Sequence, residues 1–285
     1  MSESRTENLD LSSSKAESVG GGESLTVEQA IANLQAGDKG QRYYAAWWLG
    51  KFRVREPEAI SALIDALEDQ DNRTESGGYP LRRNAARALG KLGNLEAVPA
   101  LILCLDCSDF YVREAAAQSL GMLGELSSIP KLMTLLEGGL AEAMPIPGCP
   151  HLAQPYNATI EALGTLSAKE AIPLIEPFLE HPNELEQYAA ARAMYQLTGN
   201  STYGDRLIKA LGGEQLQLRR AALSDLGAIG YLPAAEAIAE TLAENSLKLI
   251  SLKGILEHQI KKHSGESQPF SESVIKLISL MDDLL

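Results

Sequence analysis

The sequence has few aromatic residues, few cysteines and no long apolar run. Only 5% of its 285 residues are aromatic, although 45% are hydrophobic. Most of this apolar content is alanine and leucine, which favours close-packed helices over β-sheet. Three cysteines, no secretory signal and no apolar stretch of spanning length predict a cytoplasmic protein with no membrane span.

The common catalytic and metal-binding motifs are also missing. There is no Gly-rich phosphate loop, no GxSxG and no HExxH, and the four histidines form no His-Glu pair. We therefore expect neither a metal nor a cofactor, and the catalytic residue is unknown. The net charge of −13 argues against nucleic acid as a partner. Cys104 and Cys107 have CxxC spacing, but Cys104 aligns with apolar residues of other repeats, so we predict that it packs in the core.

A nine-residue helix pattern returns along the chain and predicts the fold. Counting its first residue as zero, alanine tends to fill positions +3 and +4, leucine +7 and glycine +8. Positions +3, +4 and +7 share one helix face, which predicts a buried stripe. The glycine is expected to end the helix. The copies begin at Arg42, Arg82, Arg113, Tyr156, Gln187 and Arg219.

A second helix follows each copy, often with a proline near its start, which suits a first helical turn. Predicted N-caps lie four residues before three of the copies, at Asp38, Asp109 and Asn183. One helix pair cannot bury its own apolar face, whereas stacked pairs can. The sequence therefore predicts an all-α fold, an α-solenoid of about six HEAT-like repeats with the shape of a crescent.

The chain divides into three predicted parts. Residues 1–24 read as a disordered tail, 25–263 as the solenoid, and 264–285 as a linker and a C-terminal amphipathic helix that either caps the solenoid or docks on a partner. Two insertions, 70–80 and 138–155, fall between the outer and inner helix of a unit and should emerge on one edge. The first carries Tyr79 and the second carries the imidazole ring of His151, which favours a function over neutral drift.

The first copy of the pattern departs from the others at its outward positions. Columns +1 and +5 are mostly polar in the other copies, so we expect them to face solvent along the concave side. In the first copy these positions hold Tyr43 and Trp47, while +2 and +6 hold Tyr44 and Trp48. Two interpretations stay open, a capping repeat whose aromatics cover the end of the array, or a binding surface.

The arginines of the inner helices form two groups. Those at position zero, Arg42, Arg113 and Arg219, are predicted to bridge to neighbouring units. Those at +1 and +5 either lie in solvent or pair with carboxylates of a ligand or partner, and they are Arg83, Arg87, Arg192 and Arg220. Cys149 and His151 should be exposed in the second insertion, but no second ligand pair lies near them in sequence to predict zinc.

Five stretches resemble one family beyond the generic repeat. The residues YYAAWWLGKF (43–52) and GYPLRRNAAR (78–87) are its most specific part, together with 109–113, 155–159 and 218–227. The units resemble HEAT-like repeats named after phycobilisome lyases, and these stretches are similar to the E subunits of the E/F-type heterodimeric phycobilin lyases. The likeness runs from about residue 25 to about residue 260.

This resemblance implies a cyanobacterial enzyme that works as a heterodimer with an F-type subunit. Such enzymes attach phycocyanobilin, a substrate, through a thioether to a cysteine of the α-phycocyanin apoprotein. They need an aromatic surface for the flat rings and cations for the two propionates, but no nucleophile of their own. The alternative is a HEAT-repeat scaffold or adaptor that binds protein partners only.

The implied site residues are of two kinds. The candidates for binding the bilin are Tyr43, Tyr44, Trp47, Trp48, Tyr79, Arg83, Arg87, Tyr111 and Tyr156. The candidates for the partner interface are Arg192, Arg220, Cys149 and His151. The resemblance assigns no residue as the proton donor to the bilin.

Overall fold

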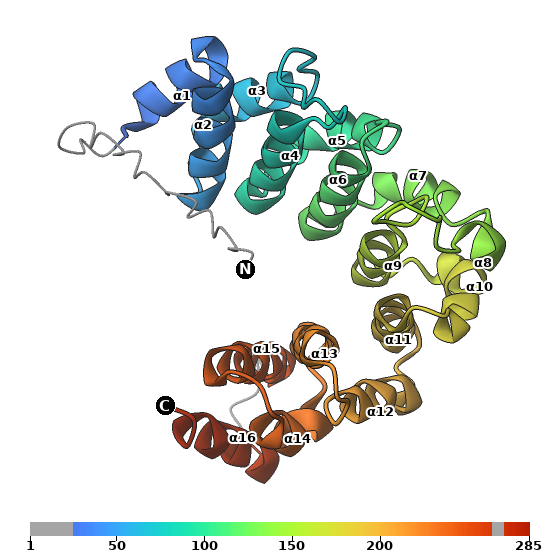
Figure 1. The fold of residues 1–285 in the computed structure, drawn as a ribbon. Coiled ribbons are helices and arrows are strands. Elements are labelled where there is room, and N and C mark those ends of the chain that lie inside the picture. The colour runs from blue at the N-terminus through green and yellow to red at the C-terminus, as the bar shows by residue number, and fades with distance from the viewer. Residues whose placement is uncertain (1–24, 264–270) are drawn as a thin grey trace, which may run out of the picture.

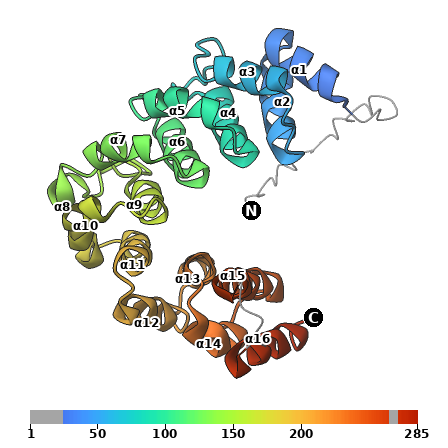
Figure 2. The ribbon, with the colours of Figure 1, turned by 180° about the vertical axis from the view of Figure 1, so that it is seen from behind.

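A computed structural model describes residues 25–263 and 271–285, and these residues form helices in two layers with no strand among them. The layers wind into a crescent, and Figures 1 and 2 show this shape from opposite sides. The inner layer consists of α2 (Lys39–Lys51), α4 (Pro80–Leu92), α6 (Phe110–Leu123), α9 (Tyr156–Thr165), α11 (Glu184–Thr198), α13 (Leu216–Ile229) and α15 (Asn245–His263). The predicted all-α solenoid is confirmed, while the predicted tail (1–24) and most of the predicted linker (264–270) lie outside the described residues.

The outer layer is made of shorter helices, several of which start with a proline or a 3₁₀ turn. They are α1 (Val27–Ala36), α3 (Pro57–Ala66), α5 (Val98–Cys104), α7 (Ile129–Thr134), α10 (Ile172–Ile175), α12 (Ser201–Ala210) and α14 (Ala235–Glu240). The core lies between the layers, where the alanine and leucine stripe of the repeat is fully buried, as at Ala45, Ala46 and Leu49. The predicted caps Asp38, Asp109 and Asn183 are confirmed, since each side chain accepts a backbone N–H of its helix.

The glycine at position +8 has a different role from the predicted one. The expectation that it ends the helix is wrong, because α4 and α6 run past it and end at Gly93 and Gly124, which adopt φ angles of 74° and 75°. The +8 glycine instead lies where adjacent inner helices meet. A Cβ atom at Gly50 would lie 2.7 Å from the Cα atom of Ala88. Glycine is therefore needed for close backbone approach, as also at Gly121, Gly164 and Gly227, while at Gly90 it leaves room for the side chains of Ser119 and Met122.

The contact between α11 and α13 is the exception. Position +8 of α11 is Tyr195, whose ring meets the ring of Tyr231 edge-on with centroids 5.1 Å apart. At the other inner-helix contacts glycine lets two helices approach closely, whereas here two large rings meet. This junction is held by side chains rather than by backbone approach.

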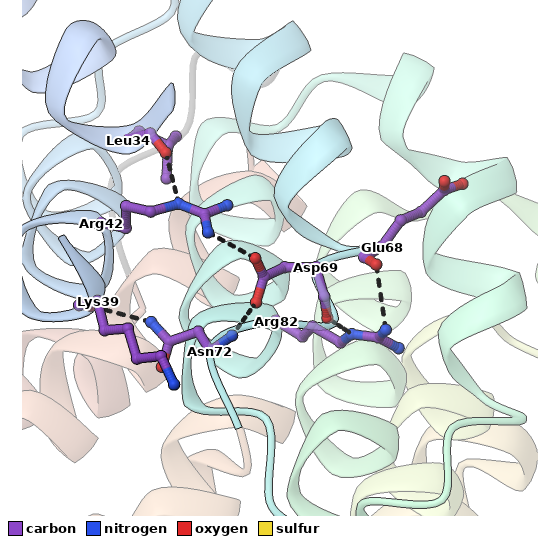
Figure 3. A network of polar contacts seen from close by, with 7 residues as sticks. All are labelled: Leu34, Lys39, Arg42, Glu68, Asp69, Asn72 and Arg82. Atoms are coloured by element: carbon purple, nitrogen blue, oxygen red, sulfur yellow. Dashed lines mark hydrogen bonds and ion pairs between the residues drawn. The ribbon is translucent and has the colours of Figure 1, made fainter. Parts of the chain in front are cut away.

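The position-zero arginines connect neighbouring units through hydrogen bonds and an ion pair (Figure 3). Arg42 donates from Nε to the Leu34 carbonyl at 3.0 Å and pairs through Nη1 with Asp69 at 2.6 Å. The Asp69 carboxylate also accepts a hydrogen bond from the Asn72 backbone N–H at 2.7 Å, and Arg82 donates to the backbone carbonyl of Asp69. The predicted structural role is confirmed for the three arginines named for it, since Arg113 and Arg219 likewise donate to backbone carbonyls.

The two insertions meet the same helix end. The Tyr79 backbone N–H, at the end of the first insertion, donates to Asp109 at 2.6 Å. Arg113, one turn further on, donates to the Ala153 carbonyl of the second insertion at 2.8 Å. Both insertions therefore flank the N-terminus of α6, which confirms that they share an edge. The second insertion contains one short helix, α8 (Gly139–Glu142).

The last helix, α16 (Glu272–Asp282), packs on the end of the solenoid. Val274 and Leu277 are fully buried, and the side-chain amide of Asn245 donates to the Leu284 carbonyl at 3.0 Å. Lys276 also forms an ion pair with Glu236 of α14. Of the two predicted roles, capping the array is the one that these contacts support.

Candidate functional site

The first inner helix, α2, presents three exposed aromatic rings. Tyr43, Tyr44 and Trp47 are 38%, 51% and 40% exposed, although rings of this size are usually covered. The rings of Tyr44 and Trp47 lie 5.4 Å apart, and the Lys51 ammonium lies 4.6 Å from the Trp47 ring. Trp48 is half-buried, packs on Phe52 and contacts the core, so it is not part of the exposed face formed by the other three rings.

The next helix, α4, adds two arginines at the matching positions. The guanidinium carbon of Arg83 lies 5.8 Å from the Tyr111 ring, and its buried Nε has no hydrogen-bond partner within residues 25–263 and 271–285. Arg87 lies 3.7 Å from Glu114 of α6 in a half-exposed ion pair. Burial raises the pKa of Glu114, and the nearby arginines Arg87 and Arg83 partly oppose this. Arg83 therefore has a buried donor that the described residues leave unpaired.

A pocket of about 380 Å³ lies beside these arginines, between α6, α9, α11 and the second insertion. One wall is the pair Phe110 and His151, whose rings stack with centroids 4.1 Å apart and an angle of 8°. Tyr111 meets His151 edge-on at 5.8 Å. The Cys149 sulfur lies 3.4 Å from His151 Nδ1, so the two candidates of the second insertion face this pocket.

Glu186 closes the other side of the pocket. It lies in the first turn of α11, is 5% exposed, and its Oε2 atom has no hydrogen-bond partner in the described part of the chain. Burial, and then the charge of Glu161, raise the pKa of Glu186 to about 7. The pocket therefore combines flat rings with a carboxyl group that exchanges its proton near neutral pH.

Arg192 and Arg220, the arginines assigned to a partner interface, are engaged within the chain. Arg192 bridges Glu161 at 2.7 Å and Asp225 at 3.2 Å and is only 16% exposed. Burial, and then Glu161, raise the pKa of Asp225 to about 7 even with this arginine present. Arg220 pairs with Glu244 near α15. Neither arginine is free in this conformation, so an interface role would require their present partners to be exchanged.

Tyr79 and Tyr156, two of the candidates for binding the bilin, are buried rather than exposed. Tyr79 is 8% exposed, with the Arg82 guanidinium 4.3 Å from its ring. Tyr156 is 1% exposed and packs on Phe178 with centroids 5.3 Å apart. Each stands at the start of an inner helix, where the side chain points between the layers. These two candidates therefore do not lie on the same exposed face as the rings of α2.

The remaining residues of the pocket were not singled out by sequence. Phe110 gave no signal beyond its place in a family-like stretch, and Glu186 looks like an ordinary acid in the first turn of a helix. Cys104 is buried in the core as predicted, and burial raises the pKa of its thiol to about 12. Across residues 25–263 and 271–285, no group of three or more potential metal ligands comes together.

The repeats match two family models. One describes the PBS lyase HEAT-like repeat and covers residues 41–69, and the other describes HEAT repeats and covers residues 74–141. The fold and these repeats define a HEAT-repeat α-solenoid. Within the described part of the chain, no helix is long and apolar enough to cross a membrane.

Whole-chain similarity is more specific. The chain is 63% identical over 264 residues to the phycocyanobilin lyase subunit alpha of Nostoc sp. (strain PCC 7120), covering 93% of this chain and 95% of that protein. It is 68% identical over 266 residues to the protein of the same name from Microchaete diplosiphon, covering 92% and 90%. The chain belongs to the phycocyanobilin lyase subunit alpha family.

A solved structure supports the same assignment. The structure of the complex of CpcE and CpcF of phycocyanin lyase from Nostoc sp. PCC7120 matches with a TM-score of 0.87 and 61% sequence identity. The match covers 96% of this chain and 100% of that one. The family that the sequence stretches resembled is therefore confirmed.

Proposed function

We propose that this chain is one subunit of a heterodimeric lyase that joins phycocyanobilin through a thioether to a cysteine of the α-phycocyanin apoprotein. Its partner in the heterodimer is an F-type subunit, the complex works in the cytoplasm, and phycocyanobilin enters as substrate rather than as a cofactor. The names of the relatives support this assignment, as does the solved complex to which the chain is similar.

One observation on this chain carries the proposal. Exposed rings and guanidinium groups follow one another along the inner helices, from Trp47 through Arg83 and Arg87 to the stacked wall of Phe110 and His151. Flat conjugated rings bind on aromatic faces, and propionate groups bind to guanidinium. An open-chain tetrapyrrole with two propionates has this combination of features.

The chain needs no nucleophile for this reaction, since the acceptor protein supplies the thiol. The surface holds and orients the bilin, which raises the effective concentration of the bilin at the acceptor cysteine. Rings on rigid inner helices suit that task, since their backbones are fixed by contact with both neighbouring helices.

Replacing Trp47 by alanine tests this function. In the heterodimer, Trp47→Ala should slow transfer of phycocyanobilin to apo-α-phycocyanin by about ten-fold, which corresponds to ~1.4 kcal/mol. The melting midpoint should barely change, because Trp47 is 40% exposed. Phe52→Ala is the matched control, since Phe52 is an exposed ring at the end of the same helix that packs on Trp48.

The assay measures bilin absorption and the coloured adduct that stays on the acceptor after denaturation. A complex that binds both proteins but leaves bilin absorption unchanged would support the adaptor alternative. Loss of melting cooperativity in Trp47→Ala would instead assign the exposed rings of α2 to capping the array.

A further inference from the structure

One oxygen of the Glu186 carboxyl group is buried without a hydrogen-bond partner. The residue is 5% exposed and Oε2 has no such partner among the residues that the structure describes, although a backbone hydrogen bond at Asn157 favours the charged form of the group. Removing a polar group from water without a hydrogen bond costs free energy, and an unpaired buried charge costs more. Folding alone would favour an apolar residue at this position.

The nearest arginine on the same helix does not compensate Glu186. Arg192 directs its guanidinium to Glu161 and Asp225 on the neighbouring helices. The charge of Glu161 raises the pKa of Glu186 further, a backbone hydrogen bond at Asn157 lowers it, and no arginine or lysine is among the neighbours that set this pKa. The titratable groups that line its pocket or interact with it electrostatically are Glu114 from α6, Tyr156 and Glu161 from α9, and Cys149 and His151 from the second insertion.

The pocket in front of Glu186 has the shape and chemistry for part of a conjugated pyrrole chain. Its volume of about 380 Å³ is bordered by the stacked rings of Phe110 and His151 and by the edge of Tyr111. Pyrrole nitrogens offer both N–H donors and an imine acceptor. A carboxylic acid complements both, because its O–H donates while its carbonyl oxygen accepts.

We propose that Glu186 is a catalytic residue that exchanges a proton with the pyrrole nitrogens of the bilin in this pocket. The inference rests on the proposed function. The unpaired oxygen then has its partner in the substrate, and the free energy lost by burying it in the empty protein is regained when the bilin binds.

Protons and bonds are conserved in this reaction, and Glu186 ends in its starting state. The acid O–H of Glu186 gives its proton to the imine nitrogen, and the resulting carboxylate pairs with the cationic bilin. The positive charge draws electrons from the ethylidene double bond, so the acceptor thiol adds there. An S–C bond forms while the π bond breaks, the thiol proton ends on the adjacent ring carbon, and the proton on nitrogen returns to Glu186.

The test compares Glu186→Gln with wild type in the complete heterodimer. Glutamine keeps the size and the hydrogen-bonding oxygen but cannot donate an acidic proton. Wild-type complex with phycocyanobilin should change its absorption with pH, with a midpoint near 7. In Glu186→Gln this transition should vanish, and transfer to apo-α-phycocyanin at neutral pH should slow by about 100-fold. Glu184→Gln is the matched control, an exposed acid of the same helix turn that should behave as wild type.

The outcomes separate this inference from the proposed function. A wild-type complex that leaves bilin absorption unchanged would contradict both the proposed function and the role of Glu186. Wild-type complex that binds and transfers the bilin, alongside a Glu186→Gln complex with the same rate and the same pH transition, would overturn the role of Glu186 alone. Should the variant not fold, the wild-type titration decides, and a bound bilin with no transition between about pH 5.5 and about pH 8.5 would refute the proposal.

Discussion

The bridge made by Arg192 lends itself to a quantitative prediction. One guanidinium joins Glu161 of α9 and Asp225 of α13 at 2.7 Å and 3.2 Å, across three inner helices. The three side chains are 16%, 33% and 8% exposed. Arg192→Met keeps the aliphatic stem but removes the cation, which leaves two acids close together with no counter-charge.

The expected cost follows from this burial. Breaking a buried pair by removing one partner costs ~3–5 kcal/mol, whereas an exposed pair contributes ~0.2–1 kcal/mol. Because a third of Glu161 is accessible, water screens part of the interaction. We therefore expect Arg192→Met to lower the free energy of unfolding by about 2–3 kcal/mol at pH 8.

The loss should shrink as the pH falls. Burial raises the pKa of both acids above their usual values, in Asp225 to about 7, so their ionisation costs stability as pH rises. Without the arginine these pKa values rise further, and the acids stay protonated to higher pH. At pH 5 both are then largely neutral and need no cation, so the loss should fall below about 1 kcal/mol.

Urea unfolding followed by circular dichroism at pH 8 and pH 5 measures this difference. The double variant Arg192→Met with Asp225→Asn is the control, and it should recover much of the loss at pH 8 because one of the two uncompensated charges is gone. An equal loss at both pH values, or a double variant no more stable than the single one, would show that Arg192 acts by packing and not by charge.

Three further outcomes are expected from single changes. Gly50→Ala should lower the free energy of unfolding by ~1–3 kcal/mol, because the new Cβ would lie 2.7 Å from Ala88 Cα. Gly40→Ala in the same helix is the control, with its nearest neighbour at 3.4 Å, and urea melts of the two variants should differ. Glu186→Gln should be more stable than wild type at pH 8 and not at pH 4, because the raised pKa of about 7 makes ionisation of Glu186 costly only as pH rises toward that value; equal melting shifts at both pH values would contradict this. Cys104, whose burial raises its pKa to about 12, should resist iodoacetamide in the folded protein, as read by mass spectrometry; rapid modification would contradict its place in the core.

The repeat frame could be predicted because its signals are local. Alanine and leucine at fixed spacing define one helix face, and Asp38 and Asp109 cap helices that start directly after them. The role of Gly50 and its equivalents could not be told in the same way. Glycine suits both a helix end and a close helix contact, and only the neighbouring repeat decides between them.

The sequence predicts surface residues that occupy a repeated column, but it does not predict a site that combines residues from separate segments. Tyr43 and Trp47 stood out because the same columns are polar in other copies. The pocket has no such column, since it joins Phe110, His151 and Glu186 from three separate segments. The burial of Tyr79 and Tyr156 was not predicted, because each stands at the start of an inner helix, outside the +3, +4 and +7 positions that mark the buried stripe.

The junction at Tyr195 has a mechanical consequence. Where inner helices touch backbone to backbone, as at Gly50 and Gly121, there is nothing between them that can change shape. Between α11 and the end of α13, the rings of Tyr195 and Tyr231 meet edge-on, and the long side chain of Arg192 reaches Asp225. Because long side chains have more rotamers than a glycine contact, we expect the crescent to bend more readily at this junction than at Gly50 or Gly121. Bending there would change the distance between the rings of α2 and the last repeats.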